Sequence, residues 1–124
     1  MPGLIPHLIA GSALYLLGRY SFRKYFDGAQ KSTERFLLLF ICLLFSVIPD
    51  AFLGIYYATN LLPFKTLLPY HVNTHLIITP ITTIIFLLLI IIDSKRKPIW
   101  FLGNCAVVIH IIMDQFIQEF GALI

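Results

Sequence analysis

The sequence predicts an all-α integral membrane protein: a bundle of about four transmembrane helices, the first one short, built by a single domain over residues 1–124. Three observations support this prediction. Hydrophobic residues make up 59% of the chain and charged residues only 12%, whereas soluble domains carry about 25% charged residues. A soluble domain of 124 residues has too little interior to bury so much apolar surface. The apolar residues also gather into four runs separated by basic or proline-containing segments.

Each apolar run is expected to form one helix of the bundle. Crossing the hydrocarbon core takes about 20 residues at a rise of about 1.5 Å per residue. The first run is short and starts near Pro6, so it spans marginally or is embedded part way. The other three runs are long enough, and two of them begin at or after a proline, as helices often do. The predicted spans are Leu4–Leu17, Phe36–Tyr57, Pro69–Ile92 and Ile99–Phe120.

The basic residues predict the orientation of these spans. The first connection, Gly18–Arg35, is basic and interleaved with aromatic residues, which suits a segment in the headgroup region. The third connection, Asp93–Pro98, adds three basic residues. With four spans both connections fall on one side of the membrane, which the positive-inside rule places in the cytoplasm. We therefore expect a multi-pass protein of the cell membrane, with both termini and the loop 58–70 outside.

The positive charge does not indicate a nucleic-acid partner. The net charge is +3, but eight of the nine lysines and arginines lie in the two connections, where membrane topology explains them. The expected partner is membrane lipid, as environment and as a candidate substrate. Cys42 and Cys105 lie in apolar runs without a partner motif and are expected to be buried thiols.

Six ionisable residues within the predicted spans are expected to lie at one level of the bilayer. An ionisable side chain at bilayer depth costs about 2.5–3.5 kcal/mol on insertion scales, so each one requires a partner. Counted at about 1.5 Å per residue from the charges at the cytoplasmic end of each span, all six fall in the outer part of the membrane. They are His7, Asp50, His71, His75, His110 and Asp114.

This layer has the composition of a metal site. His71 and His75 are four residues apart, as are His110 and Asp114, so each pair faces one side of a helix. Imidazole and carboxylate together are the ligands of zinc and related transition metals. A divalent ion would neutralise the aspartates and give neutral imidazoles a partner. We expect all six residues to be metal ligands, with His71 the most expendable because it follows Tyr70 at the interface.

The same residues, taken singly, also have structural interpretations. A lone transmembrane histidine more often forms an interhelical hydrogen bond, His7 can anchor a helix at the interface, and Asp50 can cap a kinked helix end. Ser46 and Thr79 lie one helical turn from the ligands Asp50 and His75 and are candidate partners for them. Hydrogen bonds from these two hydroxyls to their own helix backbone are the alternative.

Four motifs, in this order, resemble a family of small membrane-bound metal-dependent hydrolases, some bacterial members of which are LexA-regulated inner-membrane proteins. The motifs are IPHLIAGSALY (5–15), SVIPDAF (46–52), YHVNTHLI (70–77) and VVIHIIMDQF (107–116). The resemblance covers nearly the whole chain. That family is in turn similar to the zinc-dependent phospholipase C and single-strand zinc nuclease superfamily, whose helical members bind a zinc cluster through histidines and aspartates.

The resemblance implies metal-ligand roles for His7, Asp50, His75, His110 and Asp114, and less firmly for His71. The chain departs from the family pattern at Phe52, where a second acidic residue is usual, and it lacks the further His-x-x-x-Glu pair of the soluble relatives. Six side chains can hold two ions at three ligands each. The expected cofactor is therefore a divalent metal, zinc for preference, with two ions rather than a three-metal cluster.

These patterns together predict an enzyme, a membrane-embedded metal-dependent hydrolase. Water activated by the metal would attack a phosphoester of a lipid-like or other amphiphilic substrate at the extracytoplasmic face. Asp50 or Asp114 is the expected catalytic general base. The loop 58–70 is a candidate lid, in which Lys65 is either a phosphate contact or a snorkelling anchor.

Several alternatives stay open from the sequence. The chain could be an ion- or proton-handling membrane protein, because intramembrane His and Asp residues mark ion pathways, although here they do not continue inward. A metal-stapled structural subunit without catalysis would need the same ligands, and a hydrolase of amides would use the same activated water. A homo-oligomer also stays open, because four short helices give little wall around a two-metal site.

Overall fold

Every regular element of the part of the chain that the structure describes, residues 4–59 and 61–121 of a computed structural model, is helical. The longer helices are α1 (Leu4–Ser21), α3 (Ser32–Phe45), α6 (Thr79–Ile92) and α7 (Lys97–Gly121), and the shorter ones are α2 (Arg23–Phe26), α4 (Ala51–Thr59) and α5 (Phe64–Asn73). Three 3₁₀ turns and one π turn join them: η1 (Ala29–Lys31), η2 (Ile48–Asp50), the π turn η3 (Thr74–Ile78) and η4 (Ser94–Arg96). The predicted all-α fold class is confirmed for these residues.

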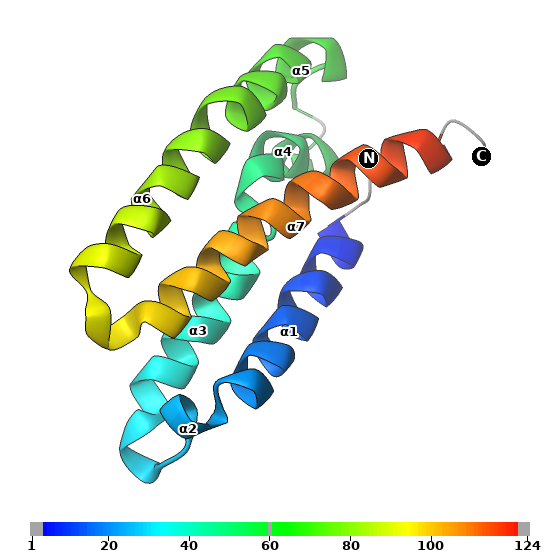
Figure 1. Ribbon diagram of the computed structural model, residues 1–124. Helices are drawn as coiled ribbons and strands as arrows, with labels where there is room; N and C mark the ends of the chain where they lie inside the picture. The colour runs from blue at the N-terminus through cyan, green and yellow to red at the C-terminus, as the bar shows by residue number, and fades with distance from the viewer. Residues whose placement is uncertain (1–3, 60, 122–124) are drawn as a thin grey trace.

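The longer helices form an up-and-down bundle centred on α7 (Figure 1). Helix α7 packs against α1, α3 and α6, and α1 packs against α3. The turn that joins α1 to α3 and the turn that joins α6 to α7 lie at one end of the bundle, whereas α4 and α5 lie at the other end (Figure 1). The two basic connections therefore share one end, as the positive-inside argument requires.

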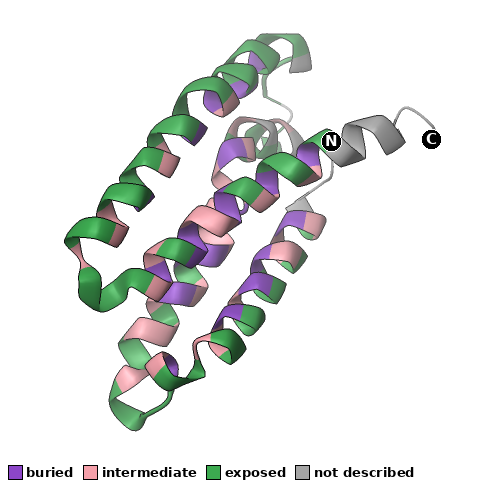
Figure 2. Ribbon diagram, in the orientation of Figure 1, coloured by how far each residue is buried: buried purple, intermediate pink, exposed green. Residues whose placement is uncertain are grey.

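Three helical segments are long and apolar enough to cross a membrane: Ala29–Asp50, Lys65–Ile92 and Ser94–Gln115. Helix α6 turns an exposed face outward along its length (Figure 2), and that face carries Ile84 and Ile91. Soluble monomers rarely expose so much contiguous apolar surface. Helix α1, the run expected to span only marginally, is not among the three segments.

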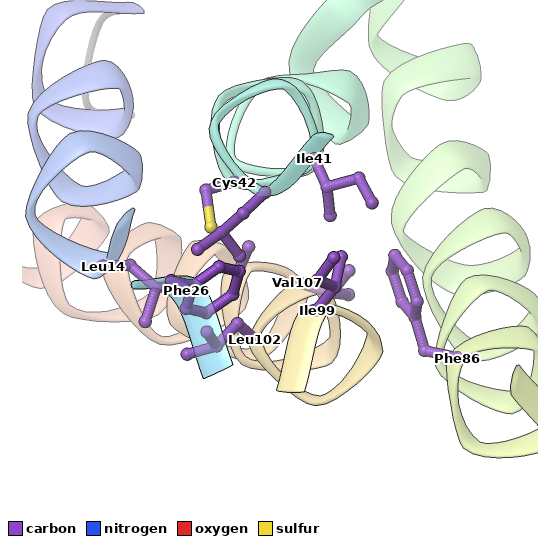
Figure 3. Close-up of a cluster of buried hydrophobic side chains, with 10 residues drawn as sticks. Leu14, Phe26, Ile41, Cys42, Phe86, Ile99, Leu102 and Val107 are labelled. Carbon is purple, nitrogen blue, oxygen red and sulfur yellow. The ribbon is translucent and has the colours of Figure 1, made fainter. Parts of the chain in front are cut away.

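A single apolar core joins α1, α2, α3, α6 and α7 (Figure 3). Two glycines allow the close helix approach on which it depends. A Cβ atom on Gly103 of α7 would lie 2.7 Å from the Phe86 ring and 2.8 Å from Ile41 Cγ2, and one on Gly11 of α1 would lie 2.6 Å from Ser46 Oγ. The buried core residues are Leu14, Phe26, Leu38, Ile41, Cys42, Phe86, Ile99, Leu102, Ala106 and Val107. Of the two cysteines, Cys42 is buried and Cys105 is half-buried.

The second and third apolar runs do not form helices with the predicted boundaries. The run 36–57 is broken after Phe45, where η2 intervenes before α4, because Pro49 has no N–H to donate and its ring clashes with a continuing helix. The third helical segment begins earlier than predicted, at Phe64, with Pro69 inside α5. Most of the loop 58–70, a candidate lid, is therefore helical.

The first connection also has more regular structure than predicted. Helix α1 continues to Ser21, and α2 and η1 follow before α3 begins. The Arg35 guanidinium donates hydrogen bonds to the carbonyl oxygens of Phe26 at 3.1 Å and Gly28 at 3.0 Å. Gly28 has a φ of 127°, a conformation that favours glycine. These contacts fix the reversal of the chain between α1 and α3.

Candidate metal centre

The six histidines and aspartates singled out in the sequence come together at the end of the bundle away from the basic turns. They are supplied by α1, η2, α5, η3 and α7, in the order His7, Asp50, His71, His75 and the pair His110 and Asp114. Each imidazole has a nitrogen within 3.8 Å of an aspartate oxygen. The predicted convergence of these side chains is confirmed, whereas their role as ligands stays a prediction.

The donor atoms surround a common centre between the two carboxylates. His7 Nε2 lies 3.2 Å from Asp50 Oδ2 and 3.2 Å from Asp114 Oδ1. His75 Nε2 lies 3.4 Å from Asp50 Oδ1 and 3.3 Å from Asp114 Oδ2. His110 Nε2 lies 3.1 Å from Asp114 Oδ2. All four carboxylate oxygens therefore face imidazole nitrogen.

These atoms fall into two groups that could each hold a metal ion. His7, Asp50, His110 and Asp114 form one group, and Asp50, His71 and His75 form the other; within each group the donor atoms lie within 4.8 Å of one another. Ligands of a tetrahedral zinc ion with bonds of about 2.0–2.1 Å are about 3.3 Å apart, which matches the nitrogen–oxygen spacings. Asp50 belongs to both groups, as a carboxylate that bridges two ions would.

Burial makes this arrangement costly without a cation. His7, His71 and His110 are at most 2% exposed and Asp114 is 6% exposed. His7 Nε2, His110 Nε2 and both Asp114 oxygens are buried, and none of them has a hydrogen-bond partner of acceptable geometry among the described residues. Buried polar atoms without partners are rare because they lose their hydration. Donor atoms that converge on one point without hydrogen-bonding to one another are characteristic of a metal site.

The orientation of the His110 ring follows from the helix break at Pro49. In a continuous helix the Ser46 carbonyl would accept the Asp50 N–H, but that N–H donates to the Val47 carbonyl instead, at 3.0 Å. The free Ser46 carbonyl oxygen lies 2.8 Å from His110 Nδ1. A carbonyl oxygen only accepts, so Nδ1 carries the proton, and in the neutral ring Nε2 presents its lone pair to the centre.

A π turn brings the third imidazole into place. In η3 the Thr79 N–H donates to the carbonyl of Thr74, five residues earlier. Such wide turns within helices are frequent at functional sites. The His75 ring, carried by this turn, lies 4.6 Å from the His71 ring and 5.3 Å from the His110 ring, measured between centroids. The turn therefore links the histidine pair of α5–η3 to α7.

Three other residues singled out in the sequence, Ser46, Thr79 and Lys65, have surroundings that differ from those of the six cluster residues. The Ser46 hydroxyl donates to the Leu43 carbonyl at 2.8 Å, so its bond is to its own helix. The Thr79 hydroxyl is buried and has no hydrogen-bond partner among the described residues. Lys65 is exposed in the first turn of α5. Sequence reasoning missed the Ser46 carbonyl, although a proline three residues later is a signal that nearby carbonyls lose their helical donors.

A cavity of about 400 Å³ reaches the centre from the side of the bundle, between α5–η3 and α7. Its inner wall is polar and belongs to the cluster, with His71, His75 and Asp114. Its other lining residues are Leu68, Val72, Leu76, Ile111 and Gln115. The centre is thus buried against the other helices but accessible from this side.

The fold and the site define a helical protein with three candidate membrane spans and a His/Asp cluster that could hold metal ions. Comparison with protein-family models, with curated proteins and with solved structures finds no match. Family membership and activity therefore stay predictions, argued from the residues of this chain.

Proposed function

We propose that this chain is a membrane-embedded metal-dependent hydrolase that holds two divalent ions, zinc for preference, in its His/Asp cluster. The observation that carries the proposal is the meeting of His110 Nε2 and Asp114 Oδ2, 3.1 Å apart. Because His110 Nδ1 donates to the Ser46 carbonyl, the neutral ring has only a lone pair to offer the carboxylate. A neutral His110 and an ionised Asp114 are both acceptors at this contact, and a divalent ion bound by both would stabilise them there.

The side chains fit such an ion in number and kind. Four imidazoles and two carboxylates are the donors that zinc takes, and two groups that share Asp50 suit a pair of ions. A bound divalent ion supplies the acidity that makes water a nucleophile near neutral pH. The role of the protein chain is to hold and orient the reacting groups and to shield them from water.

Asp114 is the better candidate for the general base. It lines the cavity, whereas Asp50 does not. Asp50 belongs to both donor groups and Asp114 to only one, so Asp50 would be the more fully used as a ligand. In this proposal Asp114 would accept the proton of the attacking water, and the neighbouring His75, the most exposed of the four imidazoles at 22%, would contact the substrate.

The substrate proposed is a phosphoester of an amphiphile at the extracytoplasmic face. The cluster lies at the end of the bundle away from the basic turns, which the positive-inside rule assigns to the cytoplasm. Paired metal ions suit in-line displacement at phosphorus, since they stabilise both the attacking and the leaving oxygen. A polar group at the membrane surface is thus within reach of the centre.

The two rival functions account less well for the structure. An ion pathway needs polar groups through the membrane, but the core between the cluster and the basic end is largely apolar, with side chains such as Leu38, Ile41 and Val107. A structural metal staple has a closed ligand shell, whereas a cavity here leads to His75 and Asp114.

The test begins with elemental analysis of the detergent-purified protein, prepared without a metal affinity step. We expect about two zinc ions per chain, lost in a His110→Ala/Asp114→Ala double variant and retained in Cys105→Ala. The same three proteins are then assayed on fluorogenic phosphomonoester and phosphodiester lipids, with hydrolysis expected only where metal is retained. Bound metal without hydrolysis of any of these substrates would favour the structural staple, and a folded, metal-resupplied protein without metal would refute the proposal.

A further inference from the structure

We infer that the cavity between α5–η3 and α7 is the binding site for a hydrocarbon chain of a membrane amphiphile, which enters sideways from the outer leaflet with its anionic head group on the His/Asp cluster. The inference depends on the proposed function in one respect: it requires a metal ion bound at the His/Asp cluster. It adds where the hydrocarbon chain of the proposed amphiphile binds, and the route by which the lipid arrives from the bilayer.

The cavity has two chemically different walls. The inner wall is formed by polar groups that the fold has buried, with His71 only 2% exposed. The outer wall is mainly aliphatic and open, with Gln115 as its polar member: Val72 is 45% exposed and Leu76 is 69% exposed on α5–η3, and Ile111 is 36% exposed on α7. A ligand that fills the cavity must therefore be polar at one end and apolar along its length.

The mouth of the cavity faces the hydrocarbon, close to its outer boundary. Its walls belong to the candidate membrane spans Lys65–Ile92 and Ser94–Gln115. Counted along the helix at about 1.5 Å per residue, His75 lies about 26 Å from Ile92 at the basic end. The hydrocarbon core is about 30 Å thick, so the cluster lies just below the outer head groups. A lipid of that leaflet meets the cavity without leaving the membrane.

The size and charge of the cavity favour one lipid over other occupants. A volume of about 400 Å³ lies in the range of small-molecule sites, about 300–1,000 Å³. A helix of another protein, about 10 Å in diameter, could cover the mouth but not reach the cluster. The lining contains neither lysine nor arginine, so the negative charge of a head group would be met by the metal ions at the cluster.

Photolabelling of the zinc-loaded protein in lipid nanodiscs tests the inference without requiring turnover. The probe is a phosphatidic acid with a photoactivatable diazirine in the upper part of one acyl chain. We expect labelling at Val72, Leu76 and Ile111 to exceed labelling at Ile84 and Ile91 at least fivefold, although these two residues of α6 are 56% and 75% exposed. Labelling should fall to the level of the α6 residues when zinc is removed.

A matched pair of variants checks the assignment. Leu76→Trp narrows the mouth of the cavity and is expected to abolish the excess labelling while the zinc content stays unchanged. Ile84→Trp adds the same ring to a lipid-facing site of α6 and should leave the excess labelling intact. Equal labelling of cavity and α6 residues in the zinc-loaded protein, as for lipid that only surrounds the helices, would overturn the inference. Selective, zinc-dependent labelling without hydrolysis of any phosphoester would uphold the lipid site and refute the hydrolase.

Discussion

His110 donates its Nδ1–H to the carbonyl oxygen of Ser46, 2.8 Å away and 64 residues earlier in the chain. This bond ties α7 to the break at the end of α3, and it orients His110 Nε2 toward Asp114 and Asp50. The acceptor is free only because the helix stops there. A proline that interrupts a predicted span thus becomes part of the candidate metal centre.

The first prediction concerns this break. Pro49→Ala restores an N–H and permits α3 to continue, so that the Ser46 carbonyl is taken up by the helix and His110 loses its acceptor. Loss of such an outer partner typically lowers metal affinity about 10- to 100-fold. Zinc affinity can be measured by competition with a fluorescent chelator, with Pro98→Ala at the basic end as the control. Unchanged affinity in Pro49→Ala would show that the Ser46 contact does not support the site.

Metal removal should lower the stability of the fold. An ion that binds only the folded protein stabilises it by about 2.7 kcal/mol when its free concentration is 100 times the Kd. We therefore expect the thermal unfolding midpoint in detergent to fall on addition of a chelator and to rise again with zinc. An Asp114→Ala variant should show no response to either. A response that persists in this variant would place the stabilising ion elsewhere.

Metal affinity should decrease as the pH is lowered. Imidazole binds a metal only in its neutral form, so protons compete with the ion for the four histidines of the cluster. Zinc retention after dialysis, measured between pH 8 and pH 5, is expected to fall steeply on the acid side and to recover when the pH is raised. Retention that is independent of pH over this range would exclude imidazole as a main ligand.

The packing at Gly103 should be intolerant of a side chain. A Cβ there would meet the Phe86 ring and Ile41 Cγ2 at under 3 Å, whereas a Cβ on Gly54 would meet no atom within 4 Å among the described residues. Overpacking of a core typically costs about 1–3 kcal/mol. Thermal unfolding of Gly103→Ala should therefore show a lower midpoint than Gly54→Ala, and equal midpoints would contradict the close approach of α7 to α3 and α6.

The orientation of the chain can be tested with single cysteines in a Cys42→Ala/Cys105→Ala background. Thr59→Cys at the end of α4 and Ser94→Cys in η4 are both exposed positions, at opposite ends of the bundle. A membrane-impermeant maleimide should label Thr59→Cys in intact cells and Ser94→Cys only after permeabilisation. The reverse pattern would place the His/Asp cluster on the cytoplasmic side.

Much of the site could be predicted from the sequence because its signal is local. A charged or imidazole side chain in an apolar run stands out wherever it falls, and a rise of about 1.5 Å per residue converts its position into depth. His110 and Asp114 share one uninterrupted helix, α7, so their common face followed from their spacing alone. The start and end of α7 were likewise predicted to within two residues.

Other features depend on contacts between distant segments, and the sequence could not supply them. Pro49 and Pro69 read alike as helix breakers, but α3 ends before the first while α5 continues through the second. The π turn that carries His75 is another such feature. Local propensity is weaker than packing, so the tertiary structure decides where a helix tolerates a proline or an extra residue in a turn.

The sequence by itself therefore determined the helical class, the basic end and the set of six polar side chains, because hydropathy and charge act residue by residue. Only the tertiary structure decided which atoms face one another: the carbonyl of Ser46 on His110, Asp50 between two donor groups, and a cavity that opens between α5–η3 and α7. Those relationships arise from the packing of helices that are separated in the chain, and packing is a property of the whole bundle.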